Sequence, residues 1–89
     1  MAPFPLGQVV ATSGALKLLE EVGEDPCLLL ARHSSGDWGE LDAHDRRENE
    51  LSLRHGWRIL SSYPVGNSRI WIITEADRSV TTILLPEEY

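Results

Sequence analysis

The stretch WRILSSYPVGNSRIWIITE, residues 57–75, decides the fold. Two runs rich in β-branched and aromatic residues, 57–63 and 69–75, flank a short segment of turn-forming residues. This composition is typical of two antiparallel strands joined by a hairpin loop over 64–68. The run 80–85 follows after a short connection and ends before a proline. The C-terminal third therefore predicts a meander of three strands.

The first third of the chain predicts one strand and one helix. Residues 6–12 are β-prone, and the prolines just before them favour an edge position over a central one. Residues 14–22 place their apolar side chains on one helical stripe, capped by Thr12 or Ser13. Gly23 follows at the position where a glycine ends a helix. An N-terminal edge strand that leads into a short helix is therefore expected.

Two more helices are expected in the middle of the chain. Asp25 followed by a proline is typical of a helix start and predicts a short helix that runs to Arg32. Asp42 is suited to cap a third, mostly polar helix over 43–55. The sum is an α+β fold. About three short helices pack on one face of a small antiparallel sheet, which combines the N-terminal strand with the C-terminal meander.

Length and charge limit the classes of function. The chain has 89 residues, which suits one domain over 1–89, and its 8 basic and 14 acidic residues give a net charge of −6. Direct nucleic-acid binding is disfavoured because it depends on neutralising phosphates with Lys and Arg. A single cysteine forms no internal disulfide, and no apolar run is long enough to span a membrane. The start of the chain lacks the features of a signal peptide, so we expect a cytoplasmic protein.

The segment RHSSGDWG, residues 32–39, is the first candidate site. As a turn-rich loop it would combine a histidine for proton transfer, an acid to orient it, an arginine for an anion and an aromatic ring for stacking. The candidate catalytic or binding residues here are Arg32, His33, Asp37 and Trp38, with Arg58 on the meander as a further arginine. A purely structural interpretation is at least as economical and is favoured. In that case the glycines and Asp37 form a turn and Trp38 fills the core.

The turn before the last strand is the second candidate site. Arg78 there would face a partner, with Asp77 beside it, and Arg78 is also a weak catalytic candidate. Alternatively, Asp77 hydrogen-bonds its own backbone, as most such turns do. We expect no metal or other cofactor, because His33, His44 and His55 lack the close ligand spacing of a metal site.

Two sequence blocks carry a family resemblance. RHxSGDWG at 32–39 and TEADRSxTTILLPxxY at 74–89 resemble a family of small bacterial accessory proteins carried by plasmids, phages and integrated elements. The opening block LGQVVATxGA at 6–15 resembles the same family. The resemblance implies no activity, fold or cofactor. It implies a setting on mobile DNA, where small proteins often bind host machinery, defence nucleases included.

Three hypotheses of function follow. The first is a non-catalytic module that binds a host or element-encoded protein, for example an inhibitor of host defence of the anti-CRISPR or anti-restriction type. The second is a small metal-independent ribonuclease, or another phosphate-handling enzyme, that uses His33, Asp37 and an arginine. The third is a homodimer paired through the first strand or the strand over 81–85. The lack of a compelling catalytic set favours the first.

Overall fold

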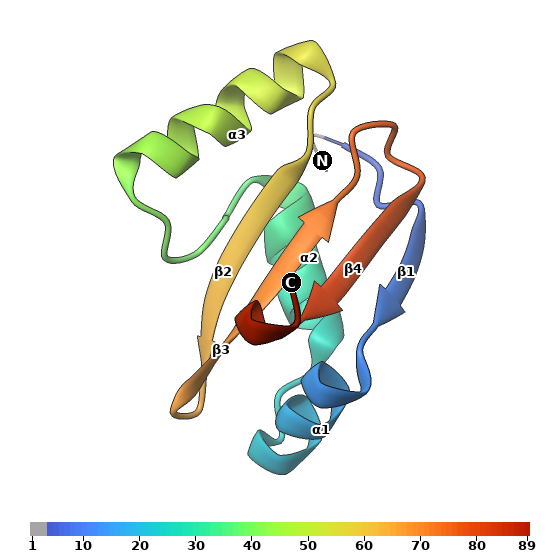
Figure 1. The fold of residues 1–89 in the computed structure, drawn as a ribbon, viewed down its shortest axis with the longest axis vertical. Coiled ribbons are helices and arrows are strands. Elements are labelled where there is room, and N and C mark those ends of the chain that lie inside the picture. The colour runs from blue at the N-terminus through green and yellow to red at the C-terminus, as the bar shows by residue number, and fades with distance from the viewer. Residues whose placement is uncertain (1–3) are drawn as a thin grey trace.

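A computed structural model describes residues 4–89 and confirms the α+β class (Figure 1). Three helices and a four-stranded sheet are followed by one turn of 3-10 helix, η1. The elements are β1 (Gln8–Ala11), α1 (Ser13–Val22), α2 (Pro26–Ser35), α3 (Ala43–His55), β2 (Ile59–Val65), β3 (Ser68–Thr74), β4 (Val80–Leu84) and η1 (Pro86–Glu88).

The sheet has the order β1-β4-β3-β2. The last three strands form the expected meander, in which each pairs antiparallel with the next. β1 lies at an edge, as predicted, but it runs parallel to β4, so the sheet is mixed and not antiparallel throughout. Nearly the whole chain connects these two strands, and a long connection of this kind permits the parallel pairing that a tight hairpin forbids.

The helices divide between one face and one edge of the sheet. α1 and α2 cover one face of the sheet, and α2 lies behind the strands in Figure 1. The core between them is formed by Ala15, Leu19, Leu29, Tyr63, Val65, Ile70, Ile72 and Ile83. α3 lies beside β2 and contacts that edge strand. This mostly polar helix has no apolar stripe to bury on a sheet face.

The helix caps follow the prediction, and the end of α2 departs from it. The Asp25 carboxylate accepts the Cys27 amide at 2.9 Å and begins the helix. The helix runs past Arg32 to Ser35, where Gly36 ends it in the left-handed region at φ +92°. The Ser35 hydroxyl donates to the Arg32 carbonyl at 3.0 Å and closes the last turn. The histidine expected in a loop therefore lies within a helix.

Of the two strands proposed to pair with a second copy, one lies inside the sheet and one lies at its edge. β4 has β1 on one side and β3 on the other, so the strand over 81–85 has no edge for a second copy. β1 pairs on one side, with β4. Within residues 4–89, no helix combines the length and apolar character needed to cross a membrane.

Candidate functional site

His33 lies in the core between α2 and the sheet. The residue is 0% exposed, with Nδ1 2.5 Å from the Ser61 Oγ and Nε2 2.8 Å from the Thr74 Oγ1. The Phe4 ring meets it edge-on, with the two centroids 5.2 Å apart. Burial lowers the pKa of His33 to about 4, so the imidazole is neutral at pH 7. A substrate has no access to this ring.

A hydrogen-bond chain continues from His33 across the sheet. Thr74 Oγ1 lies 2.7 Å from Thr81 Oγ1, and the Thr81 hydroxyl donates to the Leu6 carbonyl at 2.7 Å. Each hydroxyl has one proton and the carbonyl only accepts, so Thr74 donates to Thr81. His33 Nε2 must then donate to Thr74, and Nδ1 accepts from Ser61. The histidine therefore has a fixed tautomer and joins α2 to three strands.

Arg32 and Asp37 form an exposed ion pair at the end of α2. Arg32 Nε lies 2.7 Å from Asp37 Oδ2, and the guanidinium carbon lies 4.5 Å from the Tyr63 ring centroid. The hydrogen bond from Arg32 holds the pKa of Asp37 below its usual range. The Tyr63 hydroxyl donates to the Asp37 carbonyl at 2.6 Å, and burial raises the pKa of Tyr63 to about 12. These contacts fix the loop after α2 and do not involve the His33 nitrogens.

Residues 38–40 lie against the outer edge of β2. The Ser62 amide donates to the Trp38 carbonyl at 3.0 Å, and the Glu40 amide donates to the Ser62 carbonyl at 2.7 Å. Gly39 between them has φ +74°, and a Cβ there would lie 2.2 Å from the Ser62 oxygen. Trp38 is half-buried, and its indole nitrogen has no hydrogen-bond partner within residues 4–89. The segment 32–39 therefore forms an edge contact and not a convergent catalytic set.

Arg78 is held by backbone carbonyls of its own chain. Its backbone is in the left-handed region at φ +63°, and its guanidinium lies 5.7 Å from the Phe4 centroid. It donates at 2.6–3.1 Å to four carbonyls, those of Trp57, Ser52, Glu75 and Ala76. Arg78 thus fastens the end of α3 to the β3–β4 turn. Asp77 Oδ1 accepts the amide and the hydroxyl of Ser79, as the structural alternative predicts.

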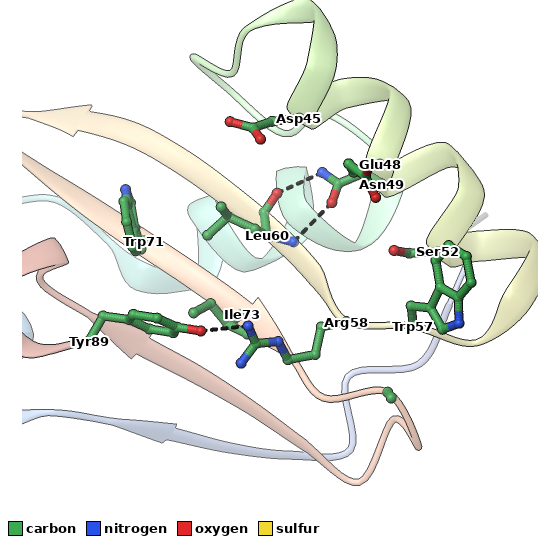
Figure 2. Close-up of a pocket in the computed structure, with 11 residues that line it drawn as sticks. Asp45, Glu48, Asn49, Ser52, Trp57, Arg58, Leu60, Trp71, Ile73 and Tyr89 are labelled. Atoms are coloured by element: carbon green, nitrogen blue, oxygen red, sulfur yellow. Dashed lines mark hydrogen bonds between the residues drawn. The ribbon is translucent and has the colours of Figure 1, made fainter.

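A groove lies on the sheet face that α1 and α2 leave uncovered. It has a volume of about 720 Å³ and lies between α3, the sheet and Tyr89 (Figure 2). Its lining residues are Asp45, Glu48, Asn49, Ser52, Trp57, Arg58, Leu60, Trp71, Ile73, Ala76 and Tyr89. Of the residues singled out by the sequence, Arg58 is the one that lines this groove within the described part of the chain.

The two walls of the groove differ in charge. Asp45 and Glu48 on α3 form an acidic wall, and Arg58 lies across from them beside Tyr89. Arg58 Nη2 donates to the Tyr89 hydroxyl at 2.5 Å. The Tyr89 ring meets Trp71 edge-on, with the centroids 5.8 Å apart. The groove therefore carries two carboxylates on the α3 wall and, across from them, one guanidinium that the Tyr89 hydroxyl holds in place.

The alternation of side chains along a strand could have placed Trp71 on the face that carries the groove. Successive side chains of a strand point to opposite faces, and Trp71 stands between two isoleucines of β3. Ile70 and Ile72 are buried in the core, so Trp71 belongs to the other face. Tyr89 and the acids of α3 carry no local signal, because the tertiary fold brings them to this face.

The histidines do not converge on a metal site. His44 is exposed and its Nε2 lies 3.7 Å from the Glu48 carboxylate, whereas His55 stacks on Trp57 with centroids 4.8 Å apart. Within residues 4–89 no group of three or more His, Cys, Asp or Glu side chains is arranged to hold a metal ion.

Comparison with protein-family models, curated proteins and solved structures finds no match for this chain.

Proposed function

We propose that this chain is a non-catalytic protein-binding module that contacts its partner through the groove beside α3. The observation that carries this proposal is the acidic and aromatic lining of the groove. Trp57, Arg58, Trp71 and Tyr89 line it together, and tryptophan, tyrosine and arginine are the residue types enriched at the energetic centres of protein interfaces. Trp57 is 49% exposed and Tyr89 is 65% exposed, so both are open to contact.

The arginines support a protein partner over a nucleic acid. Five of them donate to oxygens of this chain: Arg32, Arg46, Arg58, Arg69 and Arg78. Nucleic-acid binding depends on cations that are free to neutralise phosphates. The chain as a whole carries a net charge of −6. A basic protein is the complementary partner, and its lysine or arginine side chains suit the wall formed by Asp45 and Glu48.

We further propose a nuclease or effector complex of bacterial defence as the class of partner to test first. Such proteins present basic grooves for nucleic acid, and an acidic module can occupy them by charge complementarity. The resemblance to accessory proteins of mobile DNA points to the same class, in the host cytoplasm. Occupation of such a groove inhibits the partner without any chemistry by this chain.

The experiment compares three forms of the protein against a panel of purified restriction nucleases and CRISPR effector complexes. The test variant is Asp45→Lys with Glu48→Lys. The matched control is Glu20→Lys with Glu21→Lys, which makes the same change in charge on exposed residues of α1. We expect wild type and control to bind one panel member and inhibit its cleavage of target DNA. The test variant should bind at least about tenfold more weakly, because charge reversal in an interface costs more than 1.4 kcal/mol.

Two outcomes would refute the proposal. If the wild type binds and inhibits no member of the panel, the assigned partner class is wrong. If test and control variants bind as tightly as the wild type, the groove beside α3 is not the contact surface. Tyr89→Ala sharpens the result, because this exposed ring holds Arg58 and its loss should weaken binding with little change in stability.

A further inference from the structure

The outer side of β1 presents backbone groups with no partner among residues 4–89. The Gln8 amide donates to the Ser79 carbonyl at 2.9 Å and the Thr12 amide to the Ile83 carbonyl at 3.0 Å, so both face β4. Backbone groups alternate in direction along a strand, so those of Val9 and Ala11 point outward. Figure 1 shows this side of β1 at the edge of the molecule.

The side chains of β1 leave this edge open to approach. Val9 is 42% exposed and Val10 is 40% exposed, on opposite faces of the strand. Residues 1–16 contain no Asp, Glu, Lys, Arg or His, although the chain carries a net charge of −6. Edge strands are commonly protected from other strands by charged side chains, proline or covering segments. Between Gln8 and Ala11, β1 has no charged side chain and no proline, and no segment among residues 4–89 covers it.

We propose that β1 pairs antiparallel with β1 of a second copy of this chain and joins the two sheets into one. The register follows from the outward groups. Val9 exchanges backbone hydrogen bonds with Ala11 of the second copy, and Ala11 does so with Val9 of the second copy. The two Val10 residues then face each other across the two-fold axis as a non-hydrogen-bonded pair.

A second copy fits this edge better than a charged partner does. Two chains of the same net charge repel each other, and this repulsion is smallest where few charges meet. Residues 1–16, which include β1, carry no charged side chain. An isologous contact also satisfies donors and acceptors in equal number on both sides. The two-fold axis of an antiparallel pair stands normal to the sheet. The grooves of both copies therefore open on the same side.

The test is sedimentation equilibrium of the whole chain over a concentration series. We expect the weight-average mass of the wild type to rise from 10.0 kDa towards twice that value between about 10 µM and 1 mM. Val9→Pro removes an outward amide without touching the pairing to β4, and Val10→Lys places two charges face to face. Both variants should shift the dissociation constant upward by about tenfold or more. Val22→Lys makes the same substitution on α1, at an exposed site, and should dimerise like the wild type.

Three results would overturn the inference. One is a wild type that stays monomeric at about 1 mM. Another is a dimer that neither Val9→Pro nor Val10→Lys weakens, because such a dimer uses another surface. The third is a monomer that binds a different protein in a manner sensitive to Val9→Pro, which would assign the edge to a foreign strand. Circular dichroism at 10 µM checks that both variants keep the wild-type fold, so that loss of dimer is not loss of structure.

Discussion

The two edge strands of the sheet, β2 and β1, differ in how their outward backbone groups are protected. On β2, the residues whose backbone groups point outward are Leu60, Ser62 and Pro64, and each is closed by a different means. The Asn49 side chain donates to the Leu60 carbonyl at 2.7 Å and accepts the Leu60 amide at 3.1 Å. Residues 38–40 pair with Ser62. Pro64 has no amide proton to leave unpaired.

Within residues 4–89, the outer side of β1 has no comparable protection between Gln8 and Ala11. The contrast teaches that edge protection comes from particular residues and segments and not from the sheet topology. At β2 a helix residue, a loop and a proline each supply it at one position. The same contrast also indicates where a second strand can add, and the following predictions test its physical basis.

The largest effect should come from acid, which acts on the hydrogen-bond chain that spans the sheet from Ser61 on β2 to Leu6 before β1. The unfolded chain protonates His33 near pH 6.5 and the folded chain near pH 4. The contribution of His33 to the free energy of unfolding should therefore fall as the pH drops through this window, by a total of about 3 kcal/mol. About 2 kcal/mol of this should be lost between pH 7.5 and pH 5.

Urea denaturation of wild type and His33→Gln at these two pH values measures this loss. The variant should be less stable at pH 7.5 because glutamine does not reproduce the ring geometry. Its stability should change much less with pH, since the titrating group is gone. Equal losses in the two proteins would contradict the assignment of the acid effect to His33.

The next effect concerns the β2 edge alone. Asn49→Ala removes both hydrogen bonds to Leu60 and leaves its amide and carbonyl without partners, at a cost of about 2–3 kcal/mol. Denaturation at pH 7.5 measures the loss, and light scattering should detect new association through the opened edge. Glu50→Ala is the control on the same helix, since its side chain is exposed and should cost under about 0.5 kcal/mol.

Gly39→Ala should open the same edge one position further along. The added Cβ would lie 2.2 Å from the Ser62 carbonyl oxygen, and alanine also disfavours the positive φ of this residue. The loop must move away from β2, at a cost of about 2 kcal/mol. Gly23→Ala is a matched comparison, because Gly23 has a similar φ but open space at its Cβ. A smaller loss in Gly39→Ala than in Gly23→Ala would show that the loop contact with β2 is unimportant.

The smallest change in stability should follow Pro64→Val. The proline already sits in the strand, so the substitution loses only its stiffening of the unfolded chain, worth about 0.4–1 kcal/mol. It restores an outward amide, and association at high concentration should rise above that of the wild type in sedimentation experiments. Pro64→Val adds an outward amide to β2, whereas Val9→Pro removes one from β1. Unchanged association in both variants would remove the basis of the comparison.

The sequence predicted the parts of the fold that local chemistry determines. Asp25 and Asp42 cap the helices at the positions expected, and the glycines after α1 and α3 end them. The direction of β1 was not predictable, because a strand's pattern is the same whether its neighbour runs parallel or antiparallel. The end of α2 was missed because the polar segment HSS resembles a loop, whereas its histidine is buried against hydroxyls from the sheet.

The candidate site was predicted less well than the fold. The histidine, acid and arginine that looked catalytic, His33, Asp37 and Arg78, have separate structural partners. Their roles depend on which strands lie beside them, and no sequence spacing reports that. Arg58 was the one candidate that lies in the groove. Its neighbours come from distant segments, which explains why a search by local motif did not find them.

The parallel ladder between β1 and β4 also sets an order of events in the cell. Among the four strands β1 is synthesised first and β4 last, so residues 8–11 wait for residues 80–83 to leave the ribosome. At ordinary rates of translation this interval lasts roughly 4–14 s. Throughout it, an apolar strand without charge has both sides open to other nascent chains and to chaperones. β1, the first strand to be synthesised, can therefore pair only after the other three strands have been made.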